Sequence, residues 1–488
     1  MHSYFLPLLT SFLLKHAFCS KIPTPKIAVI GGGIGAASTT HFLTELFNND
    51  LKIDLYEANK IGGRLATIQI DDNEYEAGGS IIHSQNKYMQ EFVHLLGMEH
   101  KPSREQKFAI WNGTDIIFEA SNIKIFTLAK LMYKYGIQPF KLNSYVDSIL
   151  ADFSKIYHLQ SKGQSFMNVT SMLMAMNKEF PKLLQVSIKD QLLHLGYAEE
   201  LIDELVEAPL LADYGQTKTA VHSFVGLVTL SATTGDIWSV KGGNKKVPEH
   251  LIYRNVNVNV LSSFVKKIHY ETINNFPNYE VHYSNKDNVM KNHYDIVIIA
   301  TPLRKHEQTH ITFEGIPGDD NLTFLDEYQT VIATFIKGDI NPNYFGLEEE
   351  LDCILICNYN IDIRSIGRID TVEGPTKMNS KIWKIFSNAS LPLTLLNNIF
   401  LNIEEVKEVA WKAYPRYTTK ARLDKFKLYD GLYHVNAIEW VASAMEMSAI
   451  AGRNVAILAH DEYLQRFSNQ PNTSSTPNTP KDTQKIEL

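Results

Sequence analysis

Cysteine, excess positive charge and long apolar runs are all scarce in this sequence. Its 488 residues include three cysteines, too few for the disulfide framework of a small secreted domain. The 47 Lys and Arg are outnumbered by 54 Asp and Glu, and the net charge of -7 argues against a nucleic-acid-binding protein, which needs a basic face. No apolar run approaches the ~20 residues that span a bilayer. These absences exclude three classes of protein.

The composition that remains is that of a large folded protein. Hydrophobic residues make up 44% of the chain, and its 24 Phe and 23 Tyr are enough to line an apolar tunnel as well as a core. At ~150 residues per domain, the length indicates about two or three domains with room for a cofactor.

The two ends of the chain differ from its middle. Residues 5–14 form a short apolar run followed by small residues, which predicts a signal peptide over residues 1–19, cleaved after Cys19. The segment before the run has no Lys or Arg, and an N-terminal strand or core helix is the alternative. Residues 468–488 are polar and Pro-rich, so we expect a disordered tail; its last four residues loosely match an ER-retrieval signal.

Five Asn-x-Ser/Thr triplets are candidate N-glycosylation sites in a chain that enters the secretory pathway. They lie at Asn112, Asn168, Asn321, Asn388 and Asn472. Such triplets also arise by chance, so each one alone is weak evidence.

A dinucleotide-binding turn is predicted near the N-terminus. Residues 26–30 (KIAVI) are typical of a buried strand, a glycine-rich turn follows at once, and a helical pattern begins after it. This order is the context that the GxGxxG fingerprint requires. Gly31 permits the tight turn, Gly33 lets backbone N–H groups approach a pyrophosphate, and Ala36, just after Gly35, stands where the helix packs on the strand.

A carboxylate and two further glycine pairs follow this turn. Glu57 ends the next strand, 21 residues after Ala36, where it can accept hydrogen bonds from an adenosine ribose. The glycine pairs and the basic residue beside them are Gly62, Gly63, Arg64, Gly78 and Gly79. They suggest backbone lying against a long flat ligand, with Arg64 neutralising phosphate. We therefore favour FAD, whose isoalloxazine extends beyond the pyrophosphate, over NAD; the alternative is that Gly62 and Gly78 only form turns.

Residues 306–310 fit the H-E-x-x-H pattern of zinc metalloproteases. That chemistry requires a helix that places both His on one face. Pro302 precedes the segment closely, β-branched residues follow it, and its neighbours are polar, so no buried helix face is available. We predict no metal site.

Several long motifs match a family. Residues 26–38 (KIAVIGGGIGAAS), 52–67 (KIDLYEANKIGGRLAT), 74–83 (EYEAGGSIIH) and 431–459 (GLYHVNAIEWVASAMEMSAIAGRNVAILA) resemble prenylcysteine oxidases, a branch of the flavin amine-oxidase-like proteins. The likeness covers most of residues 26 to 460. Ala36 is a departure, because the family more often has Gly there; Ala is sterically acceptable.

The resemblance implies an α/β fold: a discontinuous, Rossmann-like FAD-binding domain of the amine-oxidase type with an inserted α+β substrate domain. We assign 20–85, 221–310 and 425–467 to the FAD-binding domain and 86–220 and 311–424 to the substrate-binding domain. The resemblance also implies that the backbone of Val265 contacts adenine. It places the N-terminus of a helix over residues 441–459 at the flavin, with Glu446 near it.

The implied reaction is oxidation of farnesyl- or geranylgeranyl-cysteine by FAD, O2 and water to cysteine, a prenyl aldehyde and H2O2. The cofactor performs the difficult step, so the protein orients and desolvates the substrate. No catalytic base is assigned; His83, Tyr214 and His222 are the candidates, and each has a structural role as its alternative.

Two other functions stay open at this point. One is oxidation of an amine or another lipid-like substrate on the same scaffold, and the other is binding of FAD or lipid without turnover, as a secreted carrier. The signal peptide, the triplets and the family point to the secretory lumen and the lysosome, with the ER lumen or secretion as alternatives. Prenyl length, covalent attachment of the flavin, oligomeric state and peripheral membrane contact are not determined by the sequence.

Overall fold

The computed structural model describes residues 22–468 except 104–105, 286–287, 304–310, 318–321, 323–326, 376–380, 421–422 and 424. The predicted signal peptide, the H-E-x-x-H segment, Asn321 and Asn472 lie outside this set. Among the described residues, no helix combines the length and apolarity needed to cross a bilayer.

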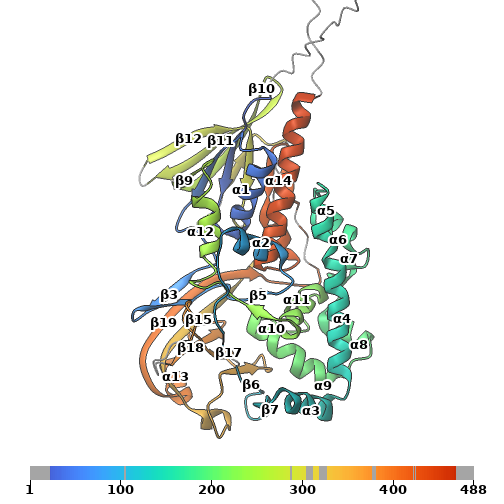
Figure 1. Ribbon diagram of the computed structural model, residues 1–488, viewed down its shortest axis with the longest axis vertical. Coiled ribbons are helices and arrows are strands. Elements are labelled where there is room, and N and C mark those ends of the chain that lie inside the picture. Colours follow the sequence, from blue (N-terminus) through green and yellow to red (C-terminus); the bar gives the residue numbers. More distant parts are fainter. Residues whose placement is uncertain are drawn as a thin grey trace, which may run out of the picture.

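A six-stranded sheet forms the centre of the upper half of the molecule (Figure 1). Its strands, in spatial order, are β20 (Lys427–Tyr429), β21 (Leu432–His434), β13 (Ile296–Ile299), β1 (Lys26–Ile30), β2 (Lys52–Glu57) and β9 (Val258–Ser262). All neighbours are parallel except β20 and β21. Segments far apart in sequence therefore build one Rossmann-like sheet.

The apolar run of β1 is buried on both faces, which is why it does not alternate with polar residues. Ile27 and Val29 face one hydrophobic cluster with helices α1 (Ile34–Leu46) and α14 (Met445–Ser468). Ala28 and Ile30 face another, formed with a four-stranded sheet. That sheet contains β12 (Asn288–Tyr294), β11 (Phe276–Asn285), β10 (Phe264–Ile273) and β14 (Thr312–Glu314).

Helices α1 and α14 cross at close range. A Cβ on Gly452 would lie 2.7 Å from the carbonyl oxygen of Gly35, and Ser38 donates a 2.7 Å hydrogen bond to the carbonyl of Ala449. Small residues at the crossing thus bring the N-terminal parts of the two helices together.

The last helix begins later than residue 441 and ends later than 459, so the predicted bounds were wrong. Residues Val435–Trp440 form a 3-10 turn, and α14 spans Met445–Ser468. The N–H of Ser443 donates to the hydroxyl of Tyr417 at 2.8 Å instead of entering a helix. The helix also takes in Ser468, the first residue of the predicted tail.

A seven-stranded sheet and a group of helices make up the lower half (Figure 1). The sheet runs β19 (Phe400–Pro415), β15 (Tyr328–Ile340), β18 (Ile382–Ser387), β17 (Ile363–Arg368), β16 (Cys353–Ile356), β6 (Phe108–Trp111) and β7 (Ile116–Glu119). The helices are α3 (Lys124–Tyr135), α4 (Gln138–Phe153), α5 (Lys155–Ser161), α6 (Val169–Met176), α7 (Phe180–Leu183), α8 (Ile188–His194), α9 (Glu199–Leu201), a π-helical turn (Ile202–Val206), α10 (Glu207–Tyr214) and α11 (Ser223–Thr234).

Shorter elements complete the fold. They are β3 (Thr67–Ile70), β4 (Asn73–Glu76), β5 (Ile82–His83), α2 (Lys87–Leu95), β8 (Ile237–Trp238), α12 (Lys246–Tyr253), the 3-10 turn Pro342–Phe345 and α13 (Leu393–Ile399).

The mixed α/β class with a Rossmann-like sheet is confirmed, whereas the domain bounds stay a prediction. Helix α11 packs against α4, α8 and α10, which groups residues 223–234 with the helices of the lower half. Helix α2 packs against α12 and α14 and so belongs with the upper half.

Candidate cofactor cradle and substrate pocket

The glycine-rich turn leaves the carboxyl end of β1 as predicted. Gly31 has φ +104°, and a Cβ there would lie 2.6 Å from the carbonyl oxygen of Ala300. Gly33 forms the N-cap of α1, which no side chain caps and whose first turn holds no acid. The nearest atom to a Cβ on Gly33 would be the Gly62 oxygen, 4.0 Å away. The backbone N–H groups at this helix N-terminus have no side-chain cap, and no side chain fills the space at Gly33. Such a site suits a pyrophosphate.

The second glycine pair lies directly on this turn. Gly33 and Gly62 form a parallel β-bridge, and the Gly62 N–H donates to the carbonyl of Gly32 at 2.9 Å. A Cβ on Gly63 would lie 3.4 Å from the Cα of Gly33. The pair therefore brings two stretches of backbone together at the start of α1.

The third pair is held against Arg64. A Cβ on Gly78 would lie 1.9 Å from the Arg64 carbonyl oxygen, and the Gly79 N–H donates to the same oxygen at 3.1 Å. Gly78 thus serves close backbone packing, and its contact with a cofactor stays a prediction, as does that of Gly79.

Glu57 and Val265 mark the expected adenosine end. The Glu57 carboxylate accepts the N–H of Gly32 and that of Asn59, each at 2.7 Å. The Ser263 N–H donates to the Glu57 carbonyl at 3.0 Å. This hydrogen bond holds the segment that leads to Val265, which is buried, next to Glu57. The start of β10, with Val265, therefore lies near the carboxyl end of β2.

The charge of Arg64 is already matched within the protein. Its guanidinium pairs with Glu439 and donates to the carbonyl of Ala413 at 2.6 Å. Glu439 also accepts hydrogen bonds from Tyr328 (2.8 Å) and Asn436 (2.6 Å). Burial acts to raise the pKa of Glu439, but the Arg64 guanidinium and the hydrogen bonds from Tyr328 and Asn436 together hold that pKa below its usual range.

This network changes the role expected of Arg64. A fully paired guanidinium contributes hydrogen bonds and position more than net positive charge toward phosphate. Glu439 was missed by sequence reasoning, although it is the one charged residue in the apolar stretch 431–445, and that isolation was the available signal.

Glu446 lies in the first turn of α14 and is buried. Its carboxylate accepts the N–H groups of Tyr88 (2.7 Å) and Met89 (3.0 Å) at the start of α2, and the hydroxyl of Tyr157 (2.8 Å). Burial nevertheless raises its pKa to about 7. Glu446 therefore caps α2, and its predicted contact with a cofactor is untested.

An apolar pocket opens beside Glu446. Its walls come from α4, α11 and the start of α14, and are formed by Val146, Ile149, Leu150, Phe153, Phe224, Leu227, Val228, Ala444 and Met447. The polar residues of the lining are His83, Gln85, Asn86, Ser154, Tyr157, Ser231 and Glu446. A mostly apolar lining with a few polar side chains is typical of a ligand-binding pocket.

Of the three candidate bases, His83 alone lines this pocket. Its Nδ1 accepts the Gln85 N–H at 3.1 Å, while its buried Nε2 has no hydrogen-bond partner among the described residues. Burial lowers its pKa. A Cβ on Gly235 would lie 1.9 Å from this Nε2, so the nitrogen packs against the Gly235 backbone, and a catalytic role for His83 stays a prediction.

Tyr214 and His222 have other contacts. The Tyr214 hydroxyl donates to the Ser443 carbonyl at 3.2 Å. His222 Nδ1 accepts the Val225 N–H at 3.3 Å and caps α11, and its Nε2 lies 3.1 Å from the Trp440 carbonyl oxygen. Burial lowers the pKa of His222 to about 4. These bonds occupy both ring nitrogens, and a catalytic role for either residue stays an unsupported prediction.

Three of the glycosylation candidates lie among the described residues, and each is partly exposed: Asn112, Asn168 and Asn388. Asn168 caps α6 through its side-chain oxygen, which accepts the Ser171 N–H at 2.8 Å. Their modification stays a prediction.

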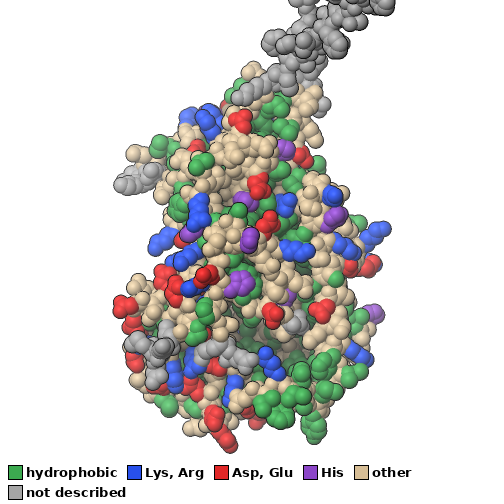
Figure 2. All heavy atoms as spheres, in the orientation of Figure 1, with side chains coloured by type: hydrophobic (Ala, Val, Ile, Leu, Met, Phe, Trp, Pro, Cys, Tyr) green, Lys and Arg blue, Asp and Glu red, His purple; other side chains and the backbone are tan. Residues whose placement is uncertain are grey.

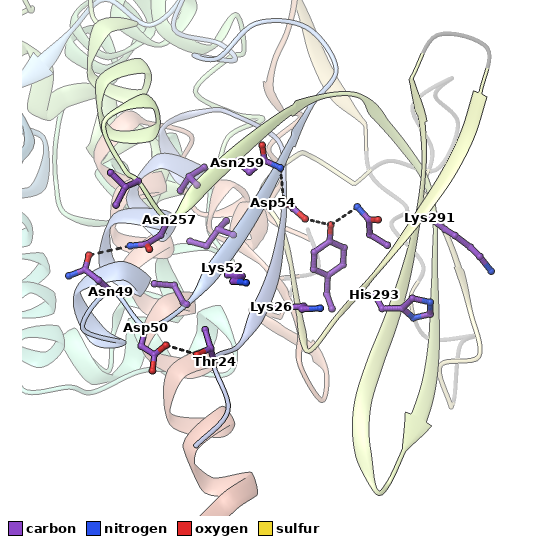
Figure 3. A pocket seen from close by; sticks show the side chains of 16 residues that line it. Thr24, Lys26, Asn49, Asp50, Lys52, Asp54, Asn257, Asn259, Lys291 and His293 are labelled. Atoms are coloured by element: carbon purple, nitrogen blue, oxygen red, sulfur yellow. Dashed lines mark hydrogen bonds between the residues drawn. The ribbon is translucent and has the colours of Figure 1, made fainter. Parts of the chain in front are cut away.

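A larger groove lies at the opposite edge of the Rossmann-like sheet (Figure 3). It is lined by the amino ends of β1 and β2, including Lys26 and Lys52, and by Asn257, Lys291 and His293. Ligands of open parallel sheets bind at the carboxyl ends of the strands. The groove is therefore not the cofactor site.

The sheet order and the glycine cradle at its carboxyl edge define a Rossmann-type dinucleotide-binding protein. A profile of NAD(P)-binding Rossmann-like domains matches residues 29–96, and one of prenylcysteine lyase matches residues 118–472. The chain belongs to the prenylcysteine lyase family.

Relatives agree with this assignment, and a solved structure has the same fold. The chain is 35% identical to bovine (Bos taurus) prenylcysteine oxidase 1 over 91% of its length and 90% of the relative's. It is 32% identical to human (Homo sapiens) prenylcysteine oxidase 1-like, over 94% and 95%. Cyclohexylamine oxidase from Brevibacterium oxydans has the same fold, with a TM-score of 0.61, 15% identity, and coverage of 91% of this chain and 100% of that one. The amine-oxidase architecture is therefore confirmed.

Proposed function

We propose that this chain is a FAD-dependent thioether oxidase that converts a prenylcysteine, O2 and water to cysteine, a prenyl aldehyde and H2O2. Family membership and the name of the bovine relative support the substrate class. The observation that carries the proposal is the apolar pocket whose lining includes Glu446, in the first turn of α14. That turn also packs beside Gly35 at the start of α1, so cradle and pocket meet at one place.

The cradle residues fit FAD. Backbone at Gly33 and Gly63 and the N-terminus of α1 would hold the pyrophosphate, and Glu57 would accept hydrogen bonds from the ribose. Bound FAD would supply a two-electron oxidant for the carbon next to sulfur, with O2 as the final acceptor.

The chain's own residues would position the substrate. The α4 and α11 walls would bury the prenyl group and exclude water from it. The polar residues of the lining would receive the cysteine, where the Glu446 carboxyl can hold or exchange a proton.

The test is an absorbance spectrum followed by anaerobic addition of farnesylcysteine. We expect flavin absorbance bands at about 370 and 450 nm, as for flavoproteins generally. The longer-wavelength band should bleach when farnesylcysteine is added. Bands that stay unbleached would favour an amine or lipid oxidase or a carrier. A colourless protein that cannot be reconstituted with FAD would overturn the proposal.

We also propose that the protein acts in the lumen of the secretory pathway, in the lysosome. The apolar run at residues 5–14 and the partly exposed Asn112, Asn168 and Asn388 support this location. A mobility shift on endoglycosidase treatment and co-fractionation with lysosomal markers test it; an unshifted cytosolic protein would contradict it.

A further inference from the structure

Helix α3 presents an apolar face to solvent. Ile125, Phe126, Leu128, Met132 and Tyr133 are all exposed, Ile125 by 67% and Tyr133 by 95%. Figure 2 shows hydrophobic side chains gathered at the lower end of the molecule, over the position of α3 in Figure 1. Contiguous apolar patches of this kind mark interaction sites on soluble proteins.

The helix is attached to the protein by its other face. Tyr135 is buried and donates a 2.5 Å hydrogen bond to Glu204, and Leu131 packs against the main hydrophobic cluster. The outward face is therefore fixed in place. Exposed Ile137 and Phe140 extend it to the start of α4. We call Ile125, Phe126, Leu128, Met132, Tyr133 and Ile137 the α3 surface.

The charge around this surface differs from that of the chain. Residues 121–141 contain four Lys and no Asp or Glu, whereas the whole chain has a net charge of -7. Lys134 pairs with Glu204 at 2.7 Å, and Lys130 donates to the Glu119 carbonyl at 3.0 Å. Lys124, Lys130 and Lys141 are exposed. An apolar helix face bordered by Lys is the pattern of helices that lie in an anionic membrane interface.

The surface leads toward the candidate substrate pocket. Helix α4 begins next to the α3 surface, and its later turns line the pocket from Val146 to Phe153. From Phe140 to Val146 the helix rises by about 9 Å. The link between the α3 surface and a substrate pocket rests on the proposed function. The exposure and charge of the α3 surface do not depend on it.

We propose that the α3 surface docks the protein on anionic lipid bilayers, with the apolar side chains in the interface and the lysines at the headgroups. A membrane-bound enzyme would then meet prenylated cysteine where such a lipid partitions. The alternative is that a second copy of the chain covers the α3 surface. The lysines of residues 121–141 would then face the same lysines of the other copy, and their repulsion would oppose self-association.

The test is co-sedimentation of the full-length purified protein with vesicles of phosphatidylcholine alone and of phosphatidylcholine with 30% phosphatidylserine by composition. We expect binding that is stronger with phosphatidylserine and falls with salt. The variant Ile125→Ser/Phe126→Ser/Tyr133→Ser should bind at least tenfold more weakly. The matched control Val256→Ser/Leu393→Ser/Leu401→Thr, which changes exposed apolar residues elsewhere, should bind like the wild type.

Further readouts separate the outcomes. Should the α3 variant fail to fold, Lys124→Gln/Lys130→Gln/Lys141→Gln tests the charges alone and should abolish the preference for phosphatidylserine. Wild-type protein that binds neither vesicle, or an α3 variant that binds normally, overturns the proposal. A dimer in light scattering that the α3 variant dissociates, without vesicle binding, assigns the surface to a second copy instead. Turnover of a water-soluble prenylcysteine should persist in the α3 variant, which keeps this test distinct from that of the catalytic proposal.

Discussion

The guanidinium of Arg64 is held by the carboxylate of Glu439, 375 residues further along the chain. This pair ties the loop after the cradle to the turn before α14. It therefore joins the first and last segments of the Rossmann-like half at the point where the cofactor is expected.

Glu439→Gln should destabilise the protein and weaken cofactor retention. The change leaves Arg64 without its counter-charge, and breaking a buried pair costs about 3–5 kcal/mol. We expect about 3 kcal/mol, the low end, because 32% of the Arg64 side chain is exposed. Chemical denaturation measures the loss. The control is Glu179→Gln, which breaks an exposed pair with Lys182 and should cost under about 1 kcal/mol; equal effects would contradict the role of Glu439.

Gly33→Leu should give a folded protein without flavin. The site has an extended φ of -80° and open space beyond the Gly62 oxygen, so the side chain fits the protein but fills the cradle. The ratio of absorbance at the flavin band to that of protein measures occupancy, and circular dichroism measures folding. Gly367→Ala, at a glycine with no atom within 4 Å of its Cβ position, should keep its flavin. A yellow Gly33→Leu protein would refute the assigned cradle.

Stability should depend on pH through Glu446. Its pKa is about 7 in the folded protein and 4.5 in the reference state, so the folded state binds the proton more tightly. The resulting stabilisation is present below pH ~4.5 and is lost as pH rises through ~7, by about 3 kcal/mol in all. The free energy of unfolding of the wild type, relative to Glu446→Gln, should fall across that window. A difference that does not vary with pH would show that Glu446 stays ionised.

Leu150→Phe should shorten the acceptable prenyl chain. Leu150 lines the pocket, so added volume there competes with the substrate. We expect kcat/KM for geranylgeranylcysteine to fall about tenfold relative to farnesylcysteine, since one misfit methylene group is worth roughly 1–3 kcal/mol. Ala151→Phe, at the adjacent exposed position on α4, is the control. An unchanged ratio in both variants would place the prenyl group elsewhere.

Local sequence alone predicted the strand, glycine-rich turn and helix at the start of the Rossmann-like sheet. The KIAVI strand, the turn at Gly31 and Gly33 and the carboxylate of Glu57 lie within about thirty residues, and their order follows from backbone geometry and burial. The long motifs added the family, because a collinear match over most of a chain is specific where a glycine turn is not.

Tertiary structure decided what these residues contact. The pairing of Arg64 with Glu439, the close packing of Gly78 on Arg64 and the capping of α2 by Glu446 all join distant segments, and no local pattern encodes such pairs. The start of α14 depended on the Tyr417 hydroxyl, and the pocket depended on α4 and α11 meeting the first turn of that helix. Sequence specifies which elements form, whereas the packing of apolar faces determines which polar side chains are buried together.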